Sequence, residues 1–370
     1  MRLEGIDLLR GLAVLLVVIY HIFTVLDLYH NPIFPYIHSF GLLGVSLFFI
    51  ISGYLIYRSF EYNISTEKLK FGLYKYISNR LFRILPAYYF NLMVVLLMAS
   101  FVLEHNYLYT GSFFRQIIAH LSFSSYFIYK DTGFGINGVY WTLSIEMLWY
   151  IVAPFFVLYI KKNKYLILLF LLSFSYLLCL DLQYLDTFLN ISNNNNLYTI
   201  LKFYWSFQLP GQLIYFISGI FIYRYIDKIR VISSPKQGIL AILILILFIY
   251  ISRSFEIHKN FFLNNFLLVS TATILFILLY RSKIKYMSIL EWFGKISYSL
   301  YLWHMPILYI MKHTNIFLHL SFSSALVVFI ISLLLLSSFS YYFIEEGGFQ
   351  LRKKFEEYMQ SRKKFKKDIK

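Results

Sequence analysis

Long apolar runs separated by short polar segments dominate the sequence. Ten of these runs approach the length of about 20 residues that a helix needs to cross the roughly 30 Å hydrocarbon core of a bilayer. We predict transmembrane helices over residues 8–26, 40–57, 84–103, 139–158, 165–180, 207–223, 238–252, 263–280, 296–311 and 321–344. The expected fold class is therefore an all-α integral membrane bundle of about ten helices. It would comprise one polytopic domain over residues 1–346 and a basic cytoplasmic tail over residues 347–370.

The basic residues alternate between the segments that connect these runs. With the N-terminus inside, the segments on the cytoplasmic side hold most of the 34 Lys and Arg residues, and the opposite segments hold few. Positively charged loops stay on the cytoplasmic side of a membrane, so both termini are predicted to be cytoplasmic. The same distribution explains the formal net charge of +16 without a nucleic-acid partner.

The composition excludes several other classes of protein. Hydrophobic residues make up 59% of the chain and charged residues only 14%, with a mean hydropathy of +0.65. Soluble domains carry roughly 25% charged residues, so a water-soluble enzyme and a disordered chain are both excluded. The one cysteine, Cys179, rules out an intrachain disulfide and a thiolate metal cage, and no metal is expected.

Three ionisable side chains other than Tyr and Cys fall inside the predicted spans, namely His21, Glu146 and His304. Ionisable groups are costly in hydrocarbon, so those that occur there are candidates for function. At 1.5 Å per residue, all three lie roughly 12–20 Å above the inner boundary, at heights compatible with one shared cavity. Interhelical hydrogen bonding is the alternative role of such a histidine, and for His304 that alternative stays open.

Helical spacing places polar partners beside these residues. Arg10 precedes His21 by eleven residues, or three turns, so the two share a face about 16 Å apart. In the same way, Tyr301 and His304 share a face in the ninth predicted span. Glu146 and Tyr150 form an i, i+4 pair in the fourth.

A pair of arginines, Arg80 and Arg83, lies just before Pro86 at the expected inner mouth of the third span. Two guanidiniums one turn apart can form a bidentate clamp for an anion such as phosphate. Ordinary positively charged anchoring at the cytoplasmic surface is the simpler interpretation of the same spacing.

Five stretches, taken in order along the chain, are specific enough to indicate a family. They are DLLRGLAVLLVVIYH (7–21), GVSLFFIISGYLI (44–56), RLFRILPAYY (80–89), YWTLSIEMLWYIVAP (140–154) and SYSLYLWHMPIL (297–308). On these stretches the chain resembles the membrane-bound acyltransferase type 3 family, which includes O-acetyltransferases of O-antigen, exopolysaccharide and peptidoglycan. The chain departs from the family pattern at Ser46, where many members carry Asp.

The resemblance implies an enzyme of the bacterial cytoplasmic membrane that spans the bilayer several times. It would transfer an acyl group, usually acetyl, from cytoplasmic acyl-CoA to a hydroxyl of an extracytoplasmic glycan. Surface polysaccharide and lipopolysaccharide O-antigen are acceptors of this kind. The residues that the resemblance marks as functional are Arg10, His21, Arg80, Arg83, Glu146, Tyr301 and His304.

The residue chemistry suggests how such a transfer would proceed. Arg10, Arg80 and Arg83 would bind the phosphates of CoA. His21 would act as general base on the acceptor hydroxyl, or would carry the acyl group itself. Glu146 would orient or stabilise the imidazolium that forms.

Other polar residues of the spans complete this hypothesis and also allow a different one. Ser144, Tyr301 or His304 would donate a hydrogen bond to the thioester oxygen as negative charge develops. The alternative is a proton-coupled transporter or glycan flippase that uses His21, Glu146 and His304 as a relay. The paired arginines favour the acyltransferase, because a proton relay does not need them.

Overall fold

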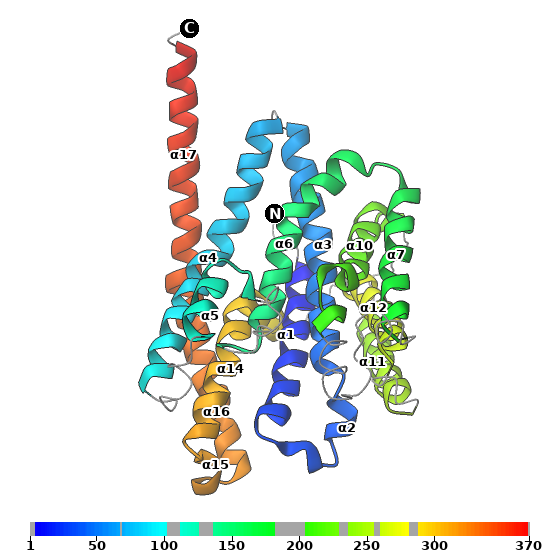
Figure 1. Cartoon of the computed structure of the whole chain (residues 1–370), viewed down its shortest axis with the longest axis vertical. Coiled ribbons are helices and arrows are strands. Elements are labelled where there is room, and N and C mark those ends of the chain that lie inside the picture. Colours follow the sequence, from blue (N-terminus) through cyan, green and yellow to red (C-terminus); the bar gives the residue numbers. More distant parts are fainter. Residues whose placement is uncertain are drawn as a thin grey trace. The chain divides into compact units, whose positions relative to one another are not determined.

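The computed structural model describes residues 4–66, 69–101, 112–125, 136–181, 204–228, 236–254, 260–280 and 288–368. The regular elements within these ranges are all helical, which confirms the predicted all-α class (Figure 1). Eight helices of the described part are long and apolar enough to cross a membrane. The chain divides into two compact units, and each is described by itself below.

The first unit comprises Met1–Arg58 and Ser122–Ser297. Its main helices are α1 (Glu4–Val25), the part of α3 (Phe40–Thr66) that ends at Arg58, α6 (Tyr140–Tyr159), α7 (Asn163–Asp181), α10 (Leu209–Tyr225), α11 (Lys236–Ser254), α12 (Phe261–Tyr280) and α13 (Ser288–Lys295). Two short elements, η1 (Leu28–His30) and α2 (Phe34–Ile37), connect α1 to α3. Helix α7 packs on α10 and α12, and α12 packs on α1 and α11.

The second unit comprises Ser59–Leu121 and Tyr298–Lys370. Beyond the last turns of α3 it contains α4 (Leu69–Phe101), α5 (Ser112–Leu121), α14 (Ser297–His313), α15 (Ile316–His319), α16 (Phe322–Phe339), the π-helical turn η6 (Ser340–Glu345) and α17 (Glu346–Asp368). Because α16, η6 and α17 follow one another without a break, they form one continuous helical segment (Figure 1).

A helix overlaps each of the ten predicted spans, but two of these helices are short. Within the described residues, α10 and α14 have 17 residues each and do not count among the eight long apolar helices. Helix α4 is longer than the predicted span, because it begins at Leu69 and not near residue 84. The segment before the apolar run is rich in Leu, Lys and Arg, which favour helix, so the helix extends beyond the hydrophobic stretch. Arg80 and Arg83 consequently lie inside α4.

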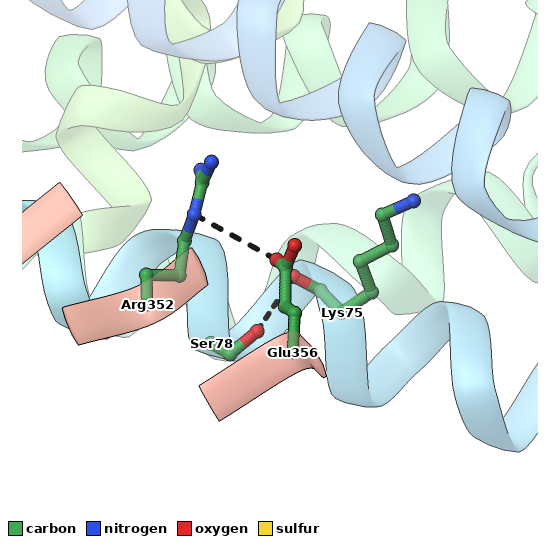
Figure 2. Close-up of polar contacts among 4 residues, drawn as sticks. All are labelled: Lys75, Ser78, Arg352 and Glu356. Atoms are coloured by element: carbon green, nitrogen blue, oxygen red, sulfur yellow. Dashed lines mark hydrogen bonds and ion pairs between the residues drawn. The ribbon is translucent and has the colours of Figure 1, made fainter. Parts of the chain in front are cut away.

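The residues of the predicted basic tail form α17, which lies alongside α4 (Figure 1). Phe355 of α17 packs against the rings of Tyr74 and Phe82, with centroids 5.7 Å away in both cases. Figure 2 shows Arg352 and Glu356 of α17 next to Lys75 and Ser78 of α4. Arg352 Nε lies 3.7 Å from Glu356 Oε1, a pair one turn apart on α17. Aromatic contacts thus attach part of this segment to the helical bundle of the second unit.

Glycines bring the backbones of the first unit into direct contact. A Cβ on Gly11 of α1 would lie 2.0 Å from the carbonyl oxygen of Leu290 in α13, and one on Gly294 would lie 1.7 Å from that of Asp7. Similarly, a Cβ on Gly44 of α3 would lie 2.5 Å from the carbonyl oxygen of Ala13 in α1. Membrane helices approach this closely only where small residues face each other. These crossings set the position of α1 and therefore of Arg10, which adjoins Gly11.

We expect Gly11→Ala to lower the melting temperature of the detergent-purified protein, because the added methyl group collides with a backbone oxygen that cannot rotate away. Overpacking of this kind costs about 1–3 kcal/mol. Gly347→Ala is the matched control: nothing lies within 4 Å of its Cβ, and alanine is the better helix former by about 1 kcal/mol. Equal melting temperatures for the two variants would contradict the packing described here.

Candidate active site

Helix α1 carries Arg10 and His21 on one uninterrupted stretch of helix, so their predicted separation of about 16 Å along the axis follows from the rise per residue. His21 Nδ1 lies 2.9 Å from the carbonyl oxygen of Val17. A carbonyl only accepts, so Nδ1 carries the proton of the neutral imidazole and donates it to this bond. Nε2 then holds the lone pair that a general base needs. The ring of Tyr20 meets the imidazole edge-on, with centroids 5.1 Å apart.

Helix α6 carries Glu146, whose carboxylate is held by two hydroxyl groups. Tyr150, one turn later, donates to Oε1 at 2.7 Å, which confirms the predicted i, i+4 pair. Ser52 of α3 donates to the same oxygen at 2.5 Å. Hydrogen bonds from hydroxyl groups to an ionised carboxylate are short and strong. The pair of bonds therefore fixes the orientation of the carboxylate between α3 and α6.

Ser144 precedes Glu146 by two residues on α6, and residues two apart on a helix point to different sides. The Ser144 hydroxyl lies 3.3 Å from that of Ser125 and 3.5 Å from the carbonyl oxygen of Tyr140. The structure therefore does not join Ser144 to the contacts of Glu146. Its catalytic role stays a prediction.

In the second unit, α14 carries Tyr301 and His304 next to each other, with ring centroids 5.8 Å apart. His304 is fully buried, and its Nδ1 lies 3.2 Å from the carbonyl oxygen of Leu300. The backbone bond again places the proton on Nδ1 and leaves the lone pair on Nε2. His21 of the first unit and His304 of the second are thus each held in the same tautomer by their own helix.

The paired arginines lie on α4, three residues apart, in different surroundings. Arg80 is buried, and its guanidinium lies over the ring of Tyr76 at 5.9 Å from the centroid. Arg83 is half-buried. Stacking on an aromatic ring orients the plane of a guanidinium, and the edge of that plane is the part that matches a phosphate. The environment of the pair is therefore compatible with the predicted phosphate clamp.

Sequence reasoning missed two polar groups that the fold brings to these helices. One is Ser52, whose contact with Glu146 joins positions far apart in the sequence. The other is Glu345, which follows the last predicted span directly and is only 4% exposed. Ser299 of α14 donates to Glu345 Oε1 at 2.5 Å. An acidic residue immediately after an apolar run was the available signal for Glu345, whereas Ser52 carried no signal of its own.

Comparisons of the sequence with known proteins show the family of this chain. The acyltransferase domain family matches residues 3–343. The O-acetyltransferase OatA of Staphylococcus aureus is 30% identical over 327 residues, which cover 83% of this chain and 50% of that protein. The O-acetyl transferase of Shigella phage Sf6 is 24% identical, covering 84% of this chain and 87% of the phage protein.

A putative acetyltransferase of Acidianus two-tailed virus is 25% identical over 80% of this chain and 81% of its own length. The chain spans about half the length of the OatA proteins that it matches. No solved structure matches it. Because the family match extends over nearly the whole chain, from the helix of Arg10 and His21 to the π-helical turn, the protein belongs to the membrane-bound acyltransferase type 3 family.

Proposed function

We propose that this protein is an O-acetyltransferase of the bacterial cytoplasmic membrane. It moves an acetyl group from cytoplasmic acetyl-CoA to a hydroxyl of an extracytoplasmic glycan, such as a surface polysaccharide or lipopolysaccharide O-antigen. The observation that carries the proposal is the imidazole of His21, held in a long apolar helix by a hydrogen bond from Nδ1 to Val17, so that the neutral ring has its basic nitrogen at Nε2. Relatives named as O-acetyltransferases support the type of reaction.

His21 performs the proton transfer in this proposal. Nε2 takes the proton of the acceptor hydroxyl as the hydroxyl oxygen forms a bond to the thioester carbonyl carbon. The carbon–sulfur bond then breaks, and the CoA thiolate leaves and takes up the proton. The products are the acetyl ester and free CoA. Glu146, fixed by Ser52 and Tyr150, stabilises the positive charge that the imidazole carries between these two proton transfers.

The remaining candidates bind the donor and stabilise its reacting oxygen. Arg10, Arg80 and Arg83 would bind the phosphates of CoA, because guanidinium groups match phosphate oxygens in charge and geometry. Tyr301 and Ser144 are the candidate donors to the thioester oxygen. His304 would donate to it only as an imidazolium, because the single proton of the neutral ring is on Nδ1 and is donated to Leu300. These assignments follow from the chemistry of the side chains, and each is testable by substitution.

We expect Arg80→Gln and Arg83→Gln each to raise the acetyl-CoA concentration at half-maximal rate by roughly ten- to hundredfold, because one charge-assisted hydrogen bond to phosphate contributes about 1.5–3 kcal/mol. Arg352→Gln serves as the control, since Arg352 lies in the same unit but pairs with Glu356 (Figure 2). The measurement is the initial rate of CoA thiol release against acetyl-CoA concentration. A similar rise in Arg352→Gln would show that general basic charge, and not the pair, binds the donor.

The proposed function is tested with the purified protein in lipid nanodiscs, supplied with radiolabelled acetyl-CoA and surface polysaccharide from the producing bacterium. Transfer of label into the polysaccharide, with release of CoA in equal amount, is the expected result. Proton movement across proteoliposomes without any transfer would instead favour the transporter hypothesis.

A further inference from the structure

A small polar cavity lies within the first unit, between α3, α6, α10 and α12. It has a volume of about 50 Å³. The polar residues that line it include His38, Ser46, Gln212, Tyr215, Asn264 and Asn265. Among the described residues at its wall there is no Asp, Glu, Lys or Arg. We call it the amide cavity. Apart from the imidazole of His38, the polar groups of its wall are uncharged amides and hydroxyls.

The side-chain oxygen of Asn264, at the wall of the amide cavity, has no hydrogen-bond partner among the described residues. Tyr215 donates to Asn265 Oδ1 at 2.6 Å, so this pair is satisfied. Asn264, only 6% exposed, has an Oδ1 that accepts no hydrogen bond from the described residues. Buried polar groups are normally paired, because leaving one unpaired loses its hydration without compensation. Asn264 therefore indicates a site that is completed by a hydrogen-bond donor from outside the described residues.

The size and walls of the amide cavity limit what that donor is. The rings of Trp141 and Phe207, which also line it, are stacked with centroids 4.6 Å apart. The volume accommodates a few water molecules or one group the size of a hydroxymethyl, but not a whole sugar ring. Neutral amides and hydroxyls with aromatic walls suit an uncharged group rich in hydroxyls.

A series of rings connects the amide cavity to His21. The ring of Tyr20 lies between two imidazoles, 5.1 Å from that of His21 and 6.3 Å from that of His38, which lines the cavity. Gly41 of α3 makes room for Tyr20, since a Cβ there would lie 2.4 Å from the Tyr20 ring. In the orientation that the basic residues predict, this end of α1 and α3 faces the extracytoplasmic side.

We infer that the amide cavity is an acceptor subsite, which binds an uncharged, hydroxyl-bearing group of a saccharide and is separated from the proposed catalytic imidazole of His21 by the ring of Tyr20. This inference rests on the proposed function, in which a saccharide is the acceptor. It adds the position of the acceptor and its preference for neutral sugars. Asn264 is the residue assigned to accept a hydrogen bond from a sugar hydroxyl.

Thermal unfolding with added saccharide tests the subsite without requiring catalysis. The probes are maltotriose, which is neutral, and trigalacturonate, which is anionic. Maltotriose is expected to raise the melting temperature of the wild-type protein with a saturable concentration dependence, because a ligand that binds the folded state stabilises it. In Asn264→Leu the half-maximal shift is expected at a concentration at least tenfold higher, and trigalacturonate is expected to give no saturable shift.

Gln237→Leu is the matched control, because Gln237 is a buried amide of the same unit whose Oε1 also has no described partner, but it lies outside the cavity. It should respond to maltotriose like the wild type.

Asn264→Ala replaces Asn264→Leu if the latter does not fold. Equal responses of wild type and both Asn264 variants would overturn the inference, as would an equal loss in Gln237→Leu or a saturable shift with trigalacturonate. Failure of acetyl transfer would overturn the proposed function and leave this binding result unaffected.

Discussion

Replacement of His21 by alanine is expected to lower the rate of acetyl transfer about 10³-fold, while the protein remains folded in the membrane. A positioned general base contributes about 10²–10⁴-fold to such a reaction, and alanine leaves nothing to accept the hydroxyl proton. Transfer of radiolabelled acetyl to polysaccharide measures the effect. The melting temperature, taken on the same preparation, measures folding.

His120→Ala is the control for this substitution. His120 of α5 is fully buried, and its Nδ1 lies 2.8 Å from the carbonyl oxygen of Gln116, one turn earlier, just as His21 relates to Val17. The two variants therefore remove the same ring and the same local bond, but only one removes the proposed base. Full activity in His21→Ala would refute the base and the acyl-carrier role together. Equal losses in both variants would assign the effect to packing.

Glu146→Gln is expected to lower the maximal rate about 100-fold with little change in either half-saturation concentration. Glutamine keeps the shape of the side chain and an oxygen that accepts from Ser52 and Tyr150, but it removes the negative charge that would stabilise the imidazolium. Ordinary saturation kinetics in both substrates separate the maximal rate from binding.

Tyr150→Phe and Ser52→Ala test whether the charge of Glu146 or its orientation is the important quantity. Each removes one hydrogen bond to Oε1 and leaves the other, so each is expected to reduce the rate less than Glu146→Gln does. If both hydroxyl variants lose as much activity as Glu146→Gln, the three groups act as one structural unit. In that case the proposed electrostatic role of the carboxylate is wrong.

The class of the fold was predictable because the bilayer imposes it. Hydrocarbon cannot hydrogen-bond to the backbone, so a continuous apolar run of about 20 residues crosses it as a helix, which satisfies its own backbone groups. A helix overlaps every predicted span for this reason. The shared helix of Arg10 and His21 and the bond from Tyr150 to Glu146 are local, so helical periodicity alone places them.

Other features were not predictable because they depend on contacts between distant segments. Hydropathy did not locate the start of α4, because the helix-favouring residues there form a polar stretch, and only the structure shows that this stretch packs against α17. Hydropathy also places the boundary of the last span one residue before Glu345, which packing buries against α14. The hydropathy of a segment depends only on its own residues, whereas its packing also depends on segments that are distant in the sequence.

The local pattern of the chain thus specified the secondary structure and the candidate residues on each helix, since both arise from neighbours within a few turns. Tertiary packing determined the partners. Ser52 meets Glu146 because α3 packs on α6, and the amide cavity exists because four helices leave a space that their side chains do not fill. Close glycine contacts make such packing possible. The periodicity within one helix does not predict which other helix will pack against it.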